Sequence, residues 1–167
     1  TPYQVWISEI MLQQTRIEAV IPYYARFLAE LPDLPSLAAV PEDRLLKLWE
    51  GLGYYSRARN LKKAAQRVMA EYGGELPRSF DELRKLPGIG DYTAGAIASI
   101  CFDLPEPAVD GNVLRVYARL MNDPSEIGDP AVKTRMFDAL LPLMPKDPGM
   151  FNQALMELGA TVCVPNG

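Results

Sequence analysis

The sequence predicts an all-α fold, and three observations support this prediction. Apolar residues recur with the 3.6-residue period of amphipathic helices along the chain, and no segment alternates convincingly with a period of two. Helix starts are marked by Thr, Ser or Asp caps that precede Pro or stand three residues before Glu. Hydrophobic residues make up 49% of the 167 residues, which suffices for one compact domain or two small lobes.

Each expected helix begins at one of these signals or follows a short polar or glycine-containing turn. The expected helices cover residues 2–13, 15–31, 41–50, 56–72, 79–86, 91–102, 111–121, 130–143 and 148–163. The caps are Thr1, Asp129 and Asp147, each directly before a proline, and the capping-box pairs are Thr15 with Glu18 and Ser79 with Glu82.

A connection between two lobes is expected just after residue 104. Pro105 and Pro107 interrupt the helical pattern there, and prolines of this kind are typical of a connecting segment. The sequence therefore predicts a first lobe over residues 1–104 and a second lobe over residues 105–167.

Composition excludes several classes of protein. The formal charge of −4, from 17 basic and 21 acidic residues, argues against a nonspecific nucleic-acid binder but permits a local basic face. The sequence contains no histidine, which removes imidazole bases and His-based metal sites. Two cysteines are too few for a disulfide framework and suit a reducing, intracellular compartment. No apolar stretch is long enough to cross a bilayer, and no signal peptide opens the chain.

Residues 83–98 read LRKLPGIGDYTAGAIA and predict a helix-hairpin-helix. The two glycines permit a sharp turn and close approach of another backbone, and the helix that follows presents unpaired N–H groups to a phosphate. A plain tight turn is the alternative for a lone Gly-x-Gly, but the small residues that follow favour contact with the DNA backbone. The residues expected to form this contact are Leu86, Gly88, Ile89, Gly90 and Thr93.

Glu9 is a candidate general acid in the first expected helix. It has apolar neighbours on both sides, and its helix has few positions that suit solvent. Partial burial raises the pKa of a carboxylic acid, so that it can donate a proton near neutral pH. From this segment alone, a solvent-exposed Glu at the helix edge is an equal alternative.

Asp110 stands in the segment VDGNV, directly before an apolar helix. A helix N-cap explains an aspartate there, and the same position favours its ionised form. An ionised carboxylate beside a protonated one is the pair that glycoside cleavage requires, because one protonates the leaving group and the other stabilises the oxocarbenium-like sugar. Sequence spacing does not show whether Glu9 and Asp110 meet.

Five segments stand out together: PYQVWISEIMLQQT (2–15), LWEGLGYYSRARNL (48–61), LPGIGDYTAGAIASI (86–100), VDGNVLRV (109–116) and FNQALMELGATVC (151–163). In this order they resemble the adenine-specific mismatch glycosylases (MutY type) of the helix-hairpin-helix glycosylase superfamily. The resemblance implies a two-lobed helical fold, in which an active-site cleft lies between a six-helix barrel and a second lobe. It also implies base excision repair of double-stranded DNA, by hydrolysis of the N-glycosidic bond of adenine opposite 8-oxoguanine or guanine.

The resemblance assigns roles to individual residues. Glu9 is implied to protonate adenine at N7 and Asp110 to stabilise the oxocarbenium-like intermediate, with Tyr92 and Asn112 assisting around the sugar and the acid. A second set is implied to wedge into the duplex or to insert beside the oxidised guanine: Leu12, Gln13, Gln14 and Tyr54. The alternatives are a solvated helix end for the two glutamines and a core aromatic pair for Tyr54 and Tyr55.

Departures from the family pattern qualify this resemblance. Related bifunctional glycosylases form a Schiff base with a lysine after the hairpin; Tyr92 stands there, so strong lyase activity is not expected. In the full-length family a [4Fe–4S] cluster is bound by four cysteines, the first of which matches Cys163. Three further ligands are absent, so no cluster is expected in this chain. The start without Met and the missing flanking segments suggest an excised core, weak or inactive on its own.

Partners and competing functions complete the predictions. We expect a monomer that binds double-stranded DNA carrying an adenine mispair, touches no membrane, and works in the cytoplasm or nucleoid of a bacterium or in a eukaryotic nucleus or mitochondrion. A basic set is expected either to face solvent or to line the DNA side: Arg57, Arg59, Lys62, Lys63 and Arg67. The competing functions are a bifunctional pyrimidine-lesion glycosylase and a non-catalytic helix-hairpin-helix module that binds DNA.

Overall fold

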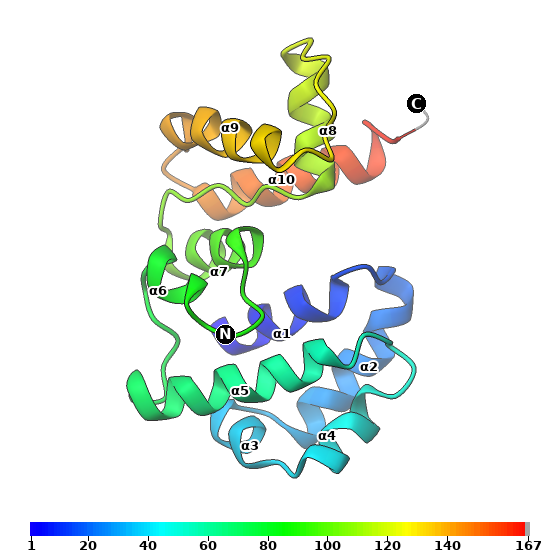
Figure 1. The fold of residues 1–167 in the computed structure, drawn as a ribbon, viewed down its shortest axis with the longest axis vertical. Helices are drawn as coiled ribbons and strands as arrows, with labels where there is room; N and C mark the ends of the chain where they lie inside the picture. Colours follow the sequence, from blue (N-terminus) through cyan, green and yellow to red (C-terminus); the bar gives the residue numbers. More distant parts are fainter. Residues whose placement is uncertain (166–167) are drawn as a thin grey trace. The chain divides into compact units, whose positions relative to one another are not determined.

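The computed structural model describes residues 1–165, and every regular element in them is helical (Figure 1). The all-α prediction is therefore confirmed. The chain forms two compact units, Thr1–Gly90 and Asp91–Gly167, and the lobe boundary expected after residue 104 stays a prediction. In the described part of the chain, no helix combines the length and the hydropathy that a membrane span requires.

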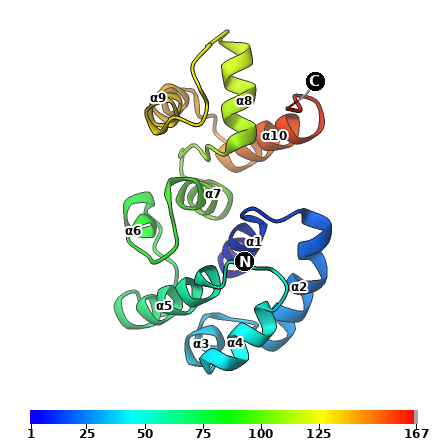
Figure 2. The ribbon, with the colours of Figure 1, turned by 45° about the vertical axis from the view of Figure 1, so that its right-hand side comes forward.

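The first unit contains six helices: α1 (Pro2–Leu12), α2 (Ile17–Glu30), α3 (Leu34–Ala39), α4 (Glu42–Trp49), α5 (Ser56–Glu71) and α6 (Phe80–Arg84). Helix α1 packs on α2, while α3 and α4 both pack on α5 (Figure 2). Large side chains fill the core between them, and the rings of Phe27 and Trp49 meet edge to face at 6.1 Å. Thr1 caps α1 through the backbone N–H of Gln4, as its sequence predicts.

Helix α3 is not expected from the sequence, and its cap explains it. The carboxylate of Asp33 accepts from the N–H of Ser36 at 2.9 Å, and the Ser36 hydroxyl accepts from the N–H of Asp33 at 3.2 Å. This reciprocal capping box, with Pro35 in the first turn, starts a helix of six residues. The buried Leu34 and Leu37 then hold the short helix on the core, where packing outweighs its small length.

The prediction of a capping box between Thr15 and Glu18 is wrong, because neither residue caps α2. Helix α2 begins at Ile17 after Arg16, which makes no side-chain capping bond. The Thr15 hydroxyl instead donates to the carbonyl of Gln13 at 3.3 Å. The turn between α1 and α2 is thus closed by contacts to the end of α1, and this turn carries two of the candidate site residues.

The second unit contains α7 (Asp91–Phe102), α8 (Gly111–Leu120), α9 (Pro130–Leu140), the 3₁₀ turn η1 (Leu141–Leu143) and α10 (Pro148–Thr161). Helix α10 packs against both α7 and α8, and the start of α8 meets α10 in both views (Figures 1 and 2). The core of this unit gathers buried side chains from α8, α9 and the segment before α8: Val109, Val113, Leu114, Val132, Met136 and Leu140. Leu155 and Met156 of α10 pack against this core.

Candidate active site

Asp110 caps α8 and makes two hydrogen bonds through its carboxylate. One oxygen accepts from the backbone N–H of Val113 at 2.8 Å, and the other accepts from the side-chain amide of Asn112 at 3.0 Å. The N-cap expected from the sequence is present. The structure therefore brings Asp110 and Asn112 together at the first turn of α8, with the carboxylate half-buried.

The orientation of the Asn112 amide is fixed by Arg115. The Arg115 guanidinium donates to the Asn112 amide oxygen at 2.8 Å and to the carbonyl of Gly159 at 2.6 Å. Because a guanidinium can only donate hydrogen bonds, the amide oxygen of Asn112 faces Arg115 and its NH₂ group faces Asp110. The Nε of Arg115 also donates to the carbonyl of Cys163 at 2.6 Å, which ties the end of α10 to the same network.

Gly159 allows α8 and α10 to approach closely at this point. A Cβ at position 159 would lie 2.6 Å from the Cβ of Asn112 and 2.9 Å from its carbonyl oxygen. Backbone atoms cannot move aside as the end of a flexible side chain can. Only glycine therefore fits where the first turn of α8 rests on α10.

Asn152 fixes the connection that leads into Asp110, and the sequence analysis missed it. Its side chain is buried and donates to the Ser99 hydroxyl at 2.8 Å and to the Glu106 carbonyl at 2.9 Å, and it accepts from the N–H of Ala108 at 3.1 Å. An asparagine flanked by apolar residues on one face of the expected helix 148–163 is the signal that could have identified it.

Tyr92, the second residue of α7, also contacts α10. Its hydroxyl donates to the sulfur of Met156 at 3.3 Å. Met156 and Gly159 lie three residues apart and so share one face of α10. Tyr92 and Asn112 therefore both contact this face, and three of the four expected catalytic residues lie in the second unit.

Glu9 belongs to the first unit, on α1. Its helix neighbours Trp6 and Ile10 are buried, with 0% and 3% exposure, while Glu9 itself is half-buried. Leu12, one turn further, is half-buried as well. The helix thus holds the carboxyl at the border of the core instead of on a fully exposed face.

Two of the residues expected to enter DNA have a left-handed backbone. Gln14, after the end of α1, has φ 56°, and Tyr54, between α4 and α5, has φ 47°. Such a conformation costs a non-glycine residue about 1–3 kcal/mol and is concentrated at functional sites. Both side chains are exposed, Tyr54 by 65%. The alternative of a core aromatic pair is therefore wrong for Tyr54 and Tyr55, which is 38% exposed.

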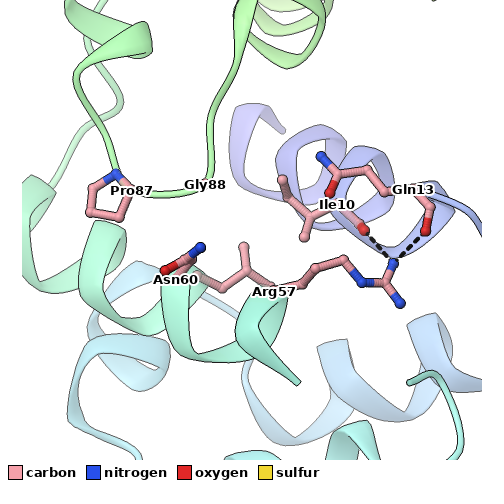
Figure 3. A pocket seen from close by; sticks show the side chains of 7 residues that line it. Ile10, Gln13, Arg57, Asn60, Pro87 and Gly88 are labelled. Carbon is pink, nitrogen blue, oxygen red and sulfur yellow. Dashed lines mark hydrogen bonds between the residues drawn. The ribbon is translucent and has the colours of Figure 1, made fainter. Parts of the chain in front are cut away.

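Arg57 lies at the start of α5, and its side chain is not on a solvated face. The side chain is only 9% exposed. Its guanidinium contacts the end of α1 (Figure 3) and also the loop that precedes α5. Desolvation lowers the pKa of Arg57 below its ordinary value. Among the other basic residues of this helix, Arg59 pairs with Glu42 and Arg67 with Glu71, each at 2.8 Å.

The hairpin loop is built as the sequence predicts, although its first helix is shorter. Gly88 has φ 79°, and a Cβ there would lie 2.8 Å from the Cβ of Asn60. Ile89 is buried and its N–H donates to the carbonyl of Leu86 at 3.1 Å. Leu86, Ile89 and Thr93 are all buried, so among the five residues expected to contact DNA it is Gly88 and Gly90 that are exposed to a partner.

A small pocket of about 50 Å³ lies within the first unit, between the end of α1, the start of α5 and the hairpin loop (Figure 3). Its lining is formed by Ile10, Gln13, Arg57, Asn60, Leu61, Pro87 and Gly88. The pocket therefore adjoins both the helix end that carries Gln14 and the hairpin.

The cysteines do not form a metal site in the part of the chain that the structure describes. Cys163 is half-buried, and its sulfur accepts from Arg119 at 3.0 Å. Cys101 is half-buried too. No group of three metal-binding side chains occurs among residues 1–165. Because a [4Fe–4S] cluster takes four cysteines and the sequence has two, these residues alone do not fit one.

Comparison with known proteins adds a family to this geometry. A family model described as "HhH-GPD superfamily base excision DNA repair protein" matches residues 7–138. The chain is 48% identical over 165 residues to the adenine DNA glycosylase of Rattus norvegicus and 43% identical over 164 residues to that of Buchnera aphidicola subsp. Baizongia pistaciae. Each match covers 98% of this chain, but 32% of the rat protein and 46% of the bacterial one.

Solved structures show the same fold. A non-covalent endonuclease III–DNA complex matches with a TM-score of 0.87 at 28% identity, over 100% of this chain and 77% of the matched one. A thermostable thymine-DNA glycosylase matches with a TM-score of 0.85 at 28% identity, over 98% of this chain and 76% of the matched one. The chain thus spans most of these structures, but a third to a half of the curated relatives named above.

Proposed function

Because the chain belongs to the HhH-GPD superfamily of base excision DNA repair proteins, we propose that it forms the catalytic core of an adenine DNA glycosylase. The reaction is hydrolysis of the N-glycosidic bond of adenine mispaired with 8-oxoguanine or guanine in double-stranded DNA. The observation that carries this proposal is the 48% identity to an adenine DNA glycosylase over 98% of this chain, which spans all the candidate site residues.

In this proposal, Glu9 and Asp110 share the chemistry. Glu9 protonates adenine at N7, which makes the base a better leaving group. Asp110, as the carboxylate, stabilises the positive charge that develops on the sugar. The Asn112 amide holds Asp110 by donating a hydrogen bond to its carboxylate, and Tyr92 contacts Met156 of α10. Water then completes the hydrolysis at the sugar carbon.

A second group of residues opens the duplex. Leu12, Gln13 and Gln14 wedge into the base stack where the adenine leaves it, and Tyr54 inserts beside the opposing base. The exposure of Gln14 and Tyr54, and the strained backbone of both, support this role. The hairpin loop binds the DNA backbone through the main-chain N–H groups of Gly88 and Gly90.

Tyr92 favours a monofunctional enzyme. A bifunctional glycosylase needs an amine to form a Schiff base with the sugar, and a phenol cannot form one. Lys85 precedes the hairpin and donates to Glu82 at 2.5 Å, so its amine is already paired with a carboxylate.

The remaining parts of the proposal concern the whole protein. It acts as a monomer inside the cell, and in the full-length protein Cys163 is the first of the four cysteine ligands of a [4Fe–4S] cluster. Such a cluster would be structural for this lobe, and the steps assigned above to Glu9 and Asp110 do not depend on it.

A single-turnover assay tests the proposed reaction. The full-length protein is mixed with a duplex that contains adenine opposite 8-oxoguanine, beside the variants Glu9→Gln and Glu75→Gln. The wild type is expected to release adenine, and Glu9→Gln to slow release by at least about a hundredfold, in line with the loss of a general acid. Glu75 is exposed and belongs to neither the proposed catalytic residues nor the proposed DNA-contact residues, so its variant should match the wild type.

The same assay separates the competing functions. If a folded wild-type protein binds the duplex but releases no base, the glycosylase proposal fails and a non-catalytic DNA-binding module remains. If, on a second duplex that carries an oxidised pyrimidine, the protein releases that base and leaves a covalent adduct on borohydride treatment, it is a bifunctional glycosylase instead.

A further inference from the structure

Arg57 is a buried cation without a carboxylate partner. Its guanidinium donates hydrogen bonds to five backbone carbonyls and, at 3.5 Å, to the Thr15 hydroxyl. No ion pair involves Arg57 in the described part of the chain, and its Nε has no hydrogen-bond partner there. Burying a cation in this way is costly for the fold, so a function for the arrangement is to be expected.

One half of the guanidinium closes the end of α1. Nη1 donates to the carbonyls of Ile10, Met11 and Gln13, at 2.9, 3.1 and 2.7 Å. Carbonyls at a helix end lack partners within the helix, and a positive charge is favourable beside them. Figure 3 shows the contacts to the carbonyls of Ile10 and Gln13, directly before Gln14.

The other half holds the loop between α4 and α5. Nη2 donates to the carbonyls of Leu52 and Gly53, at 2.9 and 3.2 Å. The Nε1 of Trp49 donates to the same Gly53 carbonyl at 3.1 Å. The guanidinium carbon also lies 5.8 Å from the centre of the Tyr54 ring. Arg57 is therefore near the backbone of this loop and near the side chain of Tyr54.

We propose that Arg57 is a positioning residue that sets the spacing between the Gln14 turn and the Tyr54 loop, so that both side chains enter the duplex together. The proposal deepens the proposed function and rests on it, because it assumes that Gln14 and Tyr54 contact DNA. A rigid, planar guanidinium can bond to both segments at once, whereas the single ammonium of lysine cannot span them. Each of the two segments contains a residue with a left-handed backbone, Gln14 or Tyr54, and both segments accept hydrogen bonds from the Arg57 guanidinium.

Binding to two duplexes tests this proposal in the full-length protein. One duplex carries a non-hydrolysable adenine analogue opposite 8-oxoguanine, and the other has the same sequence without a lesion. Arg57→Lys is expected to weaken binding to the mispair duplex by at least about tenfold and to change binding to the undamaged duplex by less than about twofold. Arg44→Lys is the matched control, because Arg44 is exposed and pairs only with Glu30, and it should bind both duplexes as the wild type does.

A double-mutant cycle with Tyr54→Ala separates positioning from support of the fold. If Arg57 acts through Tyr54, adding Arg57→Lys to Tyr54→Ala costs less than about twofold in further affinity. A tenfold cost that persists in the Tyr54→Ala background, or an equal loss on both duplexes, would overturn the proposal.

Two further outcomes are distinguished. If Arg57→Lys does not fold, Trp49→Phe takes its place. This variant removes the second donor to the Gly53 carbonyl and alters the ring that lies 5.3 Å from the guanidinium, while the Arg57 side chain itself is kept. A smaller loss confined to the mispair duplex supports the proposal, and equal losses contradict it. If the wild type releases adenine but the affinity losses of Arg57→Lys and Tyr54→Ala simply add, the role proposed for Arg57 is contradicted and the proposed function is not. If the wild type neither releases adenine nor prefers the mispair duplex, the proposed function is contradicted, and the role of Arg57 with it.

Discussion

The segment around Asp110 and the segments around Gln14 and Tyr54 are held in opposite ways. Asp110 has an extended backbone at a helix N-cap, and its neighbour Asn112 rests directly on α10. Gln14 and Tyr54 have left-handed backbones in exposed turns, and one buried arginine joins the turns. The first segment is fixed by close packing, and the others by hydrogen bonds to carbonyls.

This difference fits two different tasks. A carboxylate that stabilises a developing charge must be preorganised, and packing of helices supplies that. Side chains that enter DNA must be exposed before binding, so packing cannot hold them and a polar anchor beneath the turn does so instead. Variants that disturb packing and variants that disturb the anchor should therefore differ in what they damage.

The largest effect is expected for Gly159→Ala. The added Cβ would meet backbone atoms of Asn112 at 2.9 Å, so α8 and α10 must separate. We expect a loss of about 3 kcal/mol in the free energy of unfolding, typical of an overpacked contact, and loss of base release with it. Thermal or urea unfolding measures the first effect, and the single-turnover assay the second.

Gly128→Ala is the control for this prediction. Gly128 has no positive φ, and its Cβ would meet only the end of the Glu126 side chain at 3.9 Å. Its stability should stay within about 0.5 kcal/mol of the wild type. Equal stability of the two alanine variants would show that close packing does not hold the Asp110 segment.

Asn152→Ala should have the next largest effect. It leaves the buried N–H of Ala108 and the carbonyl of Glu106 without their partner, which costs about 2–3 kcal/mol in total. Base release should fall while binding to the undamaged duplex is kept, because the hairpin loop Gly88–Gly90 lies in the first unit and Asn152 in the second. Urea unfolding that shows a loss below about 0.5 kcal/mol would contradict the role assigned to this amide.

The smallest effect, and one of opposite sign, is expected for Gln14→Gly. Glycine adopts φ 56° without the penalty of a Cβ, so the free energy of unfolding should rise by about 0.5–1 kcal/mol. Affinity for the mispair duplex should fall at the same time, because the wedging side chain is gone. Urea unfolding measures the expected gain in stability, and a binding titration with the mispair duplex measures the expected loss of affinity.

Gln13→Gly is the matched control, since Gln13 has φ −58°. There glycine only adds conformational freedom to the unfolded chain and should destabilise by about 0.5–1 kcal/mol. If both glycine variants destabilise equally, the left-handed backbone at Gln14 stores no strain.

Most of the fold could be predicted from local signals. Several helix starts depend only on a capping residue and its near neighbours, so they can be predicted from the sequence. These caps are Thr1, Asp110, Asp129 and Asp147. Helix α3 was missed because its six residues are stabilised by packing of Leu34 and Leu37 on the core, which local pattern does not reveal.

The candidate site was predictable in its residue types but not in its supports. Asp110 and Tyr54 stand in motifs that a sequence comparison can match. Arg57 was grouped with the surface cations of α5 because charge usually faces solvent, and its partners at Gln13 and Ile10 lie 44 and 47 residues away. Contacts from one side chain to distant carbonyls leave no periodic pattern.

The absence of a carboxylate beside Arg57, in the described part of the chain, has a consequence for ionic strength. Added salt weakens contacts to phosphates by favouring counterions on the DNA. A buried guanidinium held by carbonyl dipoles is screened far less. Raising the salt concentration should therefore loosen the grip of the hairpin on the backbone while the Gln14 and Tyr54 turns keep their spacing, so that discrimination between mispaired and undamaged duplexes outlasts overall affinity.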